Sequence, residues 1–240
     1  MTELSASVRE VCSLESRTVE SMYRLYDRYY DATSETRFRA DLRGKHYVIV
    51  LNDRQGDLRG FSTLAVDETG TGEGPVRSIF SGDTIIDEAC WGEQSLAFAW
   101  IRLAGRIKAQ APDPPLYWFL IVKGFRTYRY LPAFALRYYP TWSESTPVPV
   151  QAILDCLAHR RFGDAYDPTR GVITFPASRG HLRGPWADVP EEDLQRPEVK
   201  FFLERNPGYV RGEELACITE LAPDNLKPLA RRLFSRGLAA

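Results

Sequence analysis

The segment that most constrains the fold is a run of seven residues without a charged side chain, Leu116–Val122, with the sequence LYWFLIV. A continuous apolar run of this length is typical of a central strand buried on both faces of a sheet. Such a strand needs a covering layer on each side. A chain of 240 residues, of which 44% are hydrophobic, is long enough to supply these layers in one large or two small domains.

The periodicity of the neighbouring segments predicts the elements around this strand. Before it we expect a helix, a β-hairpin, a third strand and an amphipathic helix, at residues 16–30, 46–66, 76–80 and 94–110. After it we expect a helical stretch that Pro132 kinks or splits, then further helices and strands, at residues 125–139, 150–159, 171–175, 199–204, 214–221 and 225–234. The segment ETGTGEGP, residues 68–75, is expected to be a flexible connector. This order favours a mixed α/β fold with one right-handed crossover.

Composition and charge exclude several classes of protein. Lys and Arg together number 31 and Asp and Glu 32, so no global field attracts nucleic acid or an anionic membrane. No stretch is apolar enough to span a bilayer, and MTELSASVREV does not have the pattern of a secretory signal, which favours a cytoplasmic protein. The four cysteines and three histidines are scattered, so we expect neither a disulfide framework nor a metal site.

The element order and two junctions, GDTIIDEACWGEQSL and LYWFLIVKGFRTYRYLP, resemble the GNAT acyltransferases over residues 14–140. That resemblance implies a core at residues 1–140 with a mixed, mostly antiparallel sheet flanked by helices. It also implies that the helix after the third strand receives the pyrophosphate of coenzyme A, and that the next strand is splayed from its neighbour. We expect residues 141–240 to be a C-terminal extension packed on the same core.

The family's phosphate loop has Gln or Arg, two residues, Gly, one residue, and then Gly or Ala. Ala89, Gly92 and Gln94 occupy these positions here, so only the central glycine is kept. Backbone N–H groups at residues 92–96 and the helix dipole can still hold an anion; alternatively, Gly92 only permits the turn into the helix. The candidate donor-binding residues are Trp91, Gly92, Glu93, Gln94, Ser95 and Lys123.

Some relatives with an eroded loop and a C-terminal extension take the acyl group from an acyl carrier protein. The cosubstrate is therefore expected to be acyl-CoA or an acyl-phosphopantetheine, with no tightly bound cofactor. Arg102 and Arg106 are candidates for carrier recognition, although they also fit a solvated helix face. The expected acceptor is a small-molecule amine, and the sequence leaves a monomer and a homodimer equally open.

Asp83 is the candidate to orient or deprotonate the amine, and its alternative role is that of a turn or cap carboxylate. Asp87 and Glu88 fit helix capping. The resemblance implies that Tyr128, in competition with Tyr130, protonates the departing thiolate, although aromatic residues beside a sheet often only pack. Lys123 ends an apolar strand and could contact a phosphate or a substrate carboxylate.

Two other functions stay open. One is a catalytically inactive GNAT-like module that binds a ligand or a protein. The other is an acyltransferase or hydrolase that depends on Cys90, near a helix N-terminus, with His46, His159 or His181 as its base. The irregular segment 176–193 is expected to be a lid over the acceptor site, lined by Trp186 and His181.

Overall fold

The computed structural model describes residues 4–240, which form an eight-stranded mixed sheet with the order β1-β3-β4-β5-β6-β10-β8-β7. Its strands are β1 (Ser5–Glu10), β3 (Tyr47–Asn52), β4 (Leu58–Thr71), β5 (Gly74–Ile86), β6 (Leu116–Val122), β7 (Tyr166–Asp167), β8 (Val172–Ile173) and β10 (Glu214–Glu220). All neighbouring strands are antiparallel except β5 and β6. The predicted mixed, mostly antiparallel sheet is confirmed.

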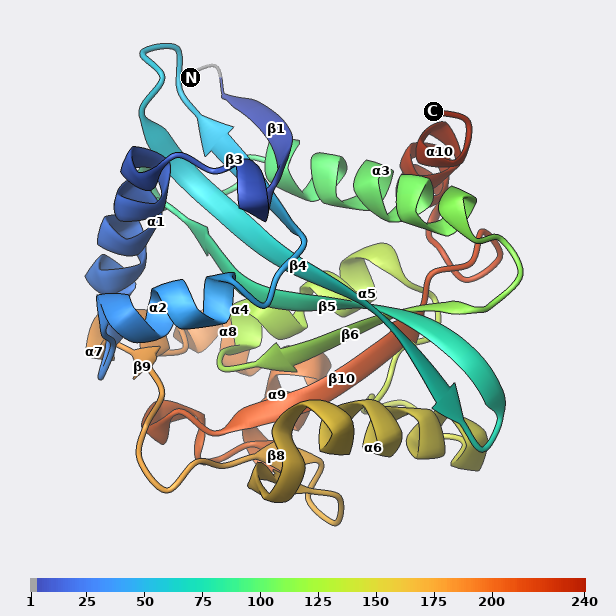
Figure 1. The fold of residues 1–240 in the computed structure, drawn as a ribbon. Helices are drawn as coiled ribbons and strands as arrows, with labels where there is room; N and C mark the ends of the chain where they lie inside the picture. Colours follow the sequence, from blue (N-terminus) through green and yellow to red (C-terminus); the bar gives the residue numbers. More distant parts are fainter. Residues whose placement is uncertain (1–3) are drawn as a thin grey trace.

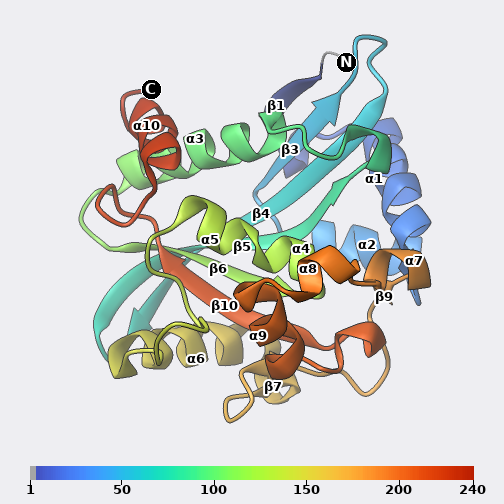
Figure 2. The same cartoon turned by 180° about the vertical axis from the view of Figure 1, so that it is seen from behind.

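Helices cover both faces of this sheet (Figures 1 and 2). They are α1 (Ser16–Tyr29), α2 (Glu35–Leu42), α3 (Ser95–Gln110), α4 (Phe125–Tyr128), α5 (Tyr130–Phe134), α6 (Val148–Phe162), α7 (Gly184–Ala187), α8 (Glu191–Leu194), α9 (Pro197–Arg205) and α10 (Pro228–Leu238). One face packs against α3, α10 and the short helices, and the other against α1 and α2 at one half and α6 at the other. None of the helices within residues 4–240 is long and apolar enough to cross a bilayer.

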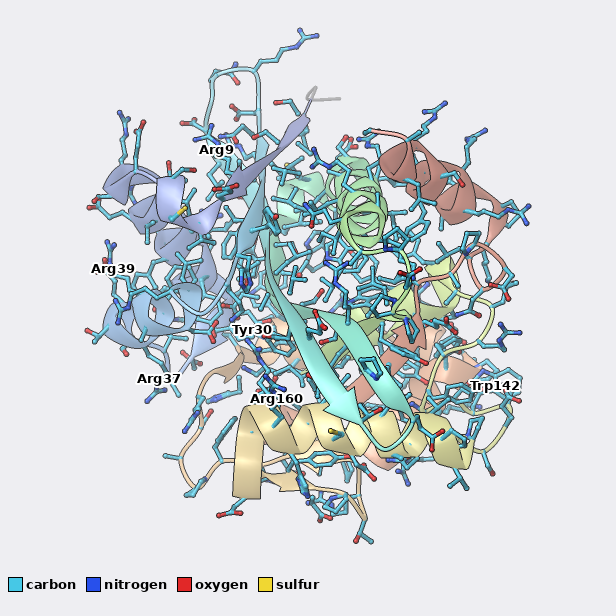
Figure 3. The ribbon with its side chains drawn as sticks, turned by 45° about the vertical axis from the view of Figure 1, so that its right-hand side comes forward. Arg9, Tyr30, Arg37, Arg39, Trp142 and Arg160 are labelled. Atoms are coloured by element: carbon cyan, nitrogen blue, oxygen red, sulfur yellow. The ribbon has the colours of Figure 1, made fainter. Side chains whose placement is uncertain are left out.

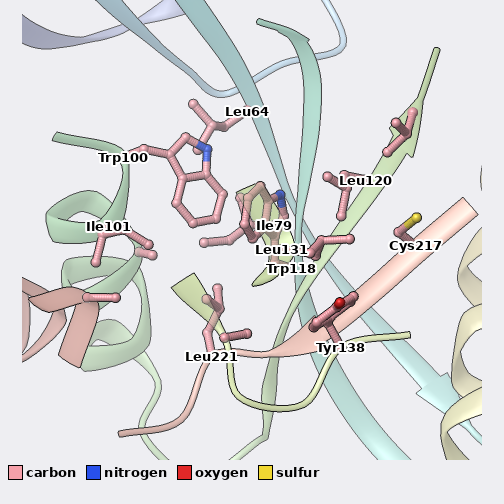
Figure 4. Close-up of a cluster of buried hydrophobic side chains, with 14 of the residues drawn as sticks. Leu64, Ile79, Trp100, Ile101, Trp118, Leu120, Leu131, Tyr138, Cys217 and Leu221 are labelled. Carbon is pink, nitrogen blue, oxygen red and sulfur yellow. The ribbon is translucent and has the colours of Figure 1, made fainter. Parts of the chain in front are cut away.

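The prediction that β6 is a central strand buried on both faces is confirmed. Trp118 and Leu120 belong to the cluster under α3 (Figure 4), whereas Phe119 packs on the opposite face with residues of α6. Strand β10 pairs with the far edge of β6, so the C-terminal hundred residues contribute a strand to the same sheet. A small second sheet joins β2 (Tyr30–Asp31) to β9 (His181–Leu182).

Two elements of the structure were not predicted, and one prediction is wrong. Helix α2 was not predicted; its N-cap is Ser34, whose hydroxyl accepts from the Arg37 amide. The polar segment SASVRE forms the edge strand β1 against β3. The expected flexible connector is wrong, because β4 and β5 continue their pairing to Thr71 and Gly74 and leave only a tight turn.

The expected helical stretch 125–139 is split at Arg129 rather than at Pro132. Pro132 lies in the first turn of α5, where a missing N–H removes no helical hydrogen bond. The helix ends at Phe134, and Tyr139 already forms a bridge to Ile218 of β10. The extended conformation at Tyr139 depends on its pairing with β10, which the local sequence does not indicate.

Candidate active site

Strands β5 and β6 run parallel and then separate. Their pairing extends from Arg77 beside Leu116 to Ser81 beside Leu120, after which β5 continues to Ile86 with β4 as its only neighbour. The third strand is therefore longer than predicted, and residues 76–80, where the gap was expected, are largely paired with β6. The gap between β5 and β6 begins after Ser81 and extends along residues 82–86 of β5.

A bulge in β5 accounts for this separation. Leu64 pairs with Ser81 and Ser62 pairs with Thr84. Two residues of β5, Gly82 and Asp83, therefore lie opposite one residue of β4, Thr63. A bulge bends its strand, increases the local twist and leaves one residue out of the ladder. The bend begins just where the parallel pairing to β6 stops, and it turns β5 away from its neighbour.

A cavity of about 1080 Å³ opens at this separation. Its walls come from α1, α2, β5, the start of α3, the end of β6, the α4–α5 segment, the end of α6 and residues 175–187. Phe80 and Ile86 both line it, and the six residue steps of strand from one to the other correspond to roughly 20 Å. Asp83 lies midway between these two positions.

Asp83 projects into the cavity from the bulge. Burial, and to a smaller extent the charge of Asp41, raises the pKa of its carboxyl to about 6, although Lys123 and Lys45 oppose the shift. Within residues 4–240 no hydrogen bond or ion pair is recorded for this carboxyl. It therefore does not act as the turn or cap carboxylate that the sequence left as an alternative.

The surroundings of Asp83 form what we call the inner charge cluster: Asp83, Asp41, Lys45, Lys123 and Glu214. Lys45 is buried and bonds the carboxylate of Asp41, while Lys123 lies 3.4 Å from Glu214. Burial raises the pKa of Glu214, and Lys123 opposes this shift. Sequence reasoning missed Lys45 and Glu214; a charge opening the apolar strand ELACITE was the available signal for the second.

The N-terminus of α3 is already occupied by a carboxylate. One oxygen of Glu93 accepts from the amides of Gln94 (2.9 Å) and Ser95 (3.0 Å) and from the Ser95 hydroxyl (2.7 Å). These bonds lower the pKa of Glu93. Gly92 has φ +92°, as the turn into the helix requires. In this conformation the predicted anion site is therefore filled by the chain itself.

Substituting Glu93 tests this competition. In Glu93→Gln a neutral amide replaces the carboxylate, so we expect coenzyme A to bind about fivefold to tenfold more tightly, as expected when like charge is removed at a helix N-terminus. Isothermal titration with coenzyme A measures the change. Glu88→Gln is the control, because Glu88 is exposed and does not line the cavity; equal dissociation constants for the two variants would contradict the assignment.

The other candidate donor residues are unevenly placed. Trp91, Gly92, Glu93 and Gln94 line the cavity, and Ser95 does not. The Trp91 indole donates to the Ile86 carbonyl at 3.0 Å, which places Trp91 at the Ile86 end. Sequence reasoning missed Arg126, whose guanidinium lies 5.0 Å from the centre of the Trp91 ring and is the cation at this end of the cavity.

Of the two tyrosines considered as the acid, only one lines the cavity in the described structure. Tyr128 is fully buried, its hydroxyl donates to the Pro140 carbonyl at 2.7 Å, and it does not line the cavity. The structure thus contradicts its expected place at the reacting atoms, because the helix turn directs it into the core. Tyr130 lines the cavity, and burial raises the pKa of its hydroxyl.

Comparison with known proteins adds a weak likeness of fold. No family model matches the chain, and no curated protein matches its sequence. Among the solved structures that match is a protein from Enterococcus faecalis described as a probable N-acyltransferase, with 12% identity, a TM-score of 0.41 and coverage of 56% of this chain. The match covers only 33% of that protein's length.

Two further matches have similar values. A GNAT family N-acetyltransferase from Escherichia coli, in complex with CoA, has 16% identity and a TM-score of 0.38, covering 56% of this chain and 71% of the other. An acyl-CoA N-acyltransferase from Pseudomonas aeruginosa has 16% identity and a TM-score of 0.37, covering 49% and 79%.

The element order, the antiparallel strands and the parted parallel pair are those that the resemblance predicted. The predicted order of the elements in the core is confirmed. The carrier-recognition candidates, Arg102 and Arg106, are exposed on α3 and do not line the cavity. Their placement matches the alternative of a solvated helix face.

The Cys90 alternative finds no support in the geometry. Cys90 does not line the cavity, and burial, together with Asp87, raises the pKa of its thiol. None of the three histidines, all within the described part of the chain, contacts it: His46 accepts from the Val66 amide, His159 packs on Tyr166 and His181 bonds Ser178. A protonated thiol without a base is a poor nucleophile.

The segment expected to be a lid does cover part of the cavity. Trp186 lines it and packs against Trp91 and Tyr29 at centroid distances of 5.5 and 5.2 Å. His181 does not line it, because its ring is turned toward the Ser178 hydroxyl. Asp87 accepts from the Ala89 amide, as expected of a cap, and also pairs with Arg28 at 2.9 Å.

Proposed function

We propose that this protein transfers an acyl group from a phosphopantetheine thioester, carried by coenzyme A or by a carrier protein, to the amine of a small molecule. The observation that carries the proposal is the position of Asp83, a carboxyl of raised pKa in the middle of the cavity where β5 leaves β6. Reactants that enter from the two sides would meet at this point.

The donor arm would lie along the free edge of β5. Past Ser81 this strand pairs, within residues 4–240, only with β4, so its other edge is open from Gly82 to Ile85 to backbone bonding by a ligand. The pantetheine amides can bond such an edge as an added strand would. Arg126, beside Trp91 at the Ile86 end, would then contact the donor's phosphate.

The chemistry needs no covalent intermediate on the protein. The amine nitrogen attacks the thioester carbonyl, and a backbone N–H left free by the bulge polarises its oxygen. Asp83 accepts the proton that the amine loses as the N–C bond forms. The C–S bond then breaks, and Tyr130 gives its hydroxyl proton to the departing thiolate.

The roles of the two tyrosines can be separated experimentally. Tyr130→Phe is expected to lower kcat at least tenfold and to leave the melting temperature nearly unchanged, because its hydroxyl has no recorded hydrogen bond within residues 4–240. Tyr128→Phe should leave kcat within twofold but destabilise the fold by about 1–3 kcal/mol, since the Pro140 carbonyl loses its partner. Thiol release and thermal melts measure the two effects. The opposite pattern would return the acid role to Tyr128.

The proposal as a whole is tested with the purified full-length chain. Acetyl-CoA, longer acyl-CoAs and acylated carrier protein are each mixed with a pool of amines, and both free thiol and new amides are measured, the latter by mass spectrometry. Release of thiol that depends on an added amine is the expected result. Amine-independent hydrolysis, or no release from any donor, would refute acyl transfer.

One observation favours a second function, that of a ligand-binding module without catalysis. The Glu93 carboxylate already fills the N-terminus of α3, where a diphosphate would otherwise be held. A binding module would show affinity for an amine or an acyl-pantetheine without turnover. Titration of these ligands beside the thiol-release assay distinguishes the two functions.

A further inference from the structure

We propose that the acceptor amine carries an anionic group, a carboxylate or a phosphate, and that Arg37, Arg161 and Arg179 bind this group at the rim of the cavity. These three residues are called the rim arginines below. The inference rests on the proposed function, because it names the class of acceptor for the same site.

A chain of aromatic contacts places two rim arginines at the Phe80 end of the cavity. The guanidinium of Arg161 lies 3.8 Å from the centre of the Phe80 ring, and Phe80 contacts Phe162 at 5.9 Å. Phe162 contacts Phe175 at 6.4 Å, and the guanidinium of Arg179 lies 3.8 Å over that ring. Trp91 and the proposed donor phosphate lie at the other end of the β5 lining, so these cations face the acceptor.

The rim arginines have unused capacity for an anion. The guanidinium of Arg37 donates only to the carbonyls of Ala32 (3.2 Å) and Ser178 (3.3 Å), and Arg179 has only its ring contact among the described residues. Arg161 is held by Asp67 at 3.1 Å. A planar guanidinium fork matches the oxygens of a carboxylate or a phosphate, so two uncompensated forks at one rim favour an anionic ligand.

The rim arginines and Asp83 line the same cavity. Arg179 is followed by Gly180, where a Cβ would lie 2.7 Å from the Tyr26 hydroxyl and 3.8 Å from the Lys123 ammonium. Lys123 is itself a member of the inner charge cluster, beside Glu214 and in electrostatic contact with Asp83. An acceptor bound in this cavity with its anion on Arg179 would have its amine on the side of Lys123 and Asp83.

Neighbouring arginines provide matched controls. Arg39 lies two positions after Arg37 on α2 but pairs with Glu35 at 2.7 Å, and Arg160 precedes Arg161 but is exposed; neither lines the cavity. Figure 3 shows Arg37, Arg39 and Arg160 on the same side of the molecule as Tyr30, which does line it. A general loss of positive charge on this side would affect controls and rim variants equally.

The experiment compares amines that differ only in the anion. Phosphoethanolamine is paired with ethanolamine, and β-alanine with its amide, so the two arms distinguish a phosphate from a carboxylate. Binding to the full-length chain without donor is measured by titration or ligand-observed NMR, and turnover by thiol release with the acyl donor. The variants are Arg37→Gln, Arg179→Gln, their double variant, Arg39→Gln and Arg160→Gln.

At least one anionic amine is expected to bind tenfold or more tightly than its neutral partner, and the double variant should abolish this preference. The control variants should keep it within twofold, and inorganic phosphate should compete with the anionic amine in the unmodified protein. Equal affinity for neutral and anionic amines, absence of binding by both, or a preference that survives in the double variant would overturn the inference.

The two proposals can fail separately. Thiol release that is equally efficient with neutral and anionic amines would leave acyl transfer standing and remove the anionic acceptor. Binding of anionic amines that depends on Arg37 and Arg179, without thiol release from any donor, would keep the anion site and remove acyl transfer.

Discussion

Replacing Asp83 by Asn is expected to lower kcat/KM of amine acylation by about 10²–10⁴-fold, the usual contribution of a positioned general base. The amide keeps the shape of the side chain in the cavity but cannot accept the amine proton. Thiol release measured across pH gives the test. Asp224→Asn is the control, since Asp224 is exposed and, among the described residues, pairs only with Arg137; a loss of less than threefold in Asp83→Asn would remove Asp83 from the reaction.

The pH profile provides a second reading of the same group. Because the pKa of Asp83 is about 6, activity should fall as the pH decreases through 6, where the carboxyl becomes protonated. Asp41→Asn removes a negative charge that raises this pKa, so the acid limb should move to lower pH. An acid limb that is unchanged in Asp83→Asn would assign it to another residue.

The buried Asp83 carboxylate is also expected to lower the free energy of unfolding at neutral pH. Its pKa in the folded chain exceeds the ordinary value of 3.8, so the folded state binds more protons than the unfolded state between about pH 4 and 6. Stability is therefore lost as the pH rises through this window, by at most about 3 kcal/mol. We expect Asp83→Asn to melt at a higher temperature than the unmodified chain at pH 7–8, while it loses activity.

The largest effect on folding is expected at Gly105. A Cβ at this position of α3 would lie 2.1 Å from the Phe234 carbonyl oxygen, and one at Gly237 of α10 would lie 2.0 Å from the Arg102 carbonyl oxygen. The two helices thus touch through their backbones. Gly105→Ala must push α10 away, and we expect a loss of about 3 kcal/mol despite the better helix propensity of alanine.

Urea unfolding followed by circular dichroism measures this loss. Gly70→Ala is the control, because a Cβ at Gly70 has no atom within 4 Å and the position has no left-handed φ. An unfolding free energy of Gly105→Ala within about 0.5 kcal/mol of the unmodified chain would show that the helices separate freely. The activity of the folded fraction should be unchanged, since neither glycine lines the cavity.

Much of the core was predictable, because its signals are local. The charge-free run at Leu116–Val122 predicted the central strand, and helical periodicity predicted α1 and α3. The same reasoning missed the strand β1, whose apolar face consists only of Ala6 and Val8, and it placed the end of the third strand at Phe80 instead of Ile86. Strand length depends on the partner, and the partner of β5 beyond Ser81 is β4.

The candidate site was predictable only in part. Asp83 and Trp91–Gln94 reach the cavity that the sequence suggested, whereas Tyr128 and Ser95 do not. Helix geometry decided between Tyr128 and Tyr130, and the sequence could not say which face of a short helix would meet the sheet. Glu93 caps α3 only because the turn at Gly92 brings its carboxylate to the helix N-terminus. The sequence is compatible with this turn but does not predict it.

The sequence by itself determined the order of the elements, the burial of the central strand and the presence of a carboxyl between the third strand and the helix. Hydrophobic periodicity and turn residues act over a few positions, so they can be recognised without a fold. Only the tertiary structure decided that Lys45, Asp83, Lys123 and Glu214 share one cavity, and that Arg37 and Arg179 lie at its rim. Arg37 and Glu214 are 177 positions apart in the sequence, and the bulge in β5 and the packing of residues 175–187 bring such distant residues together.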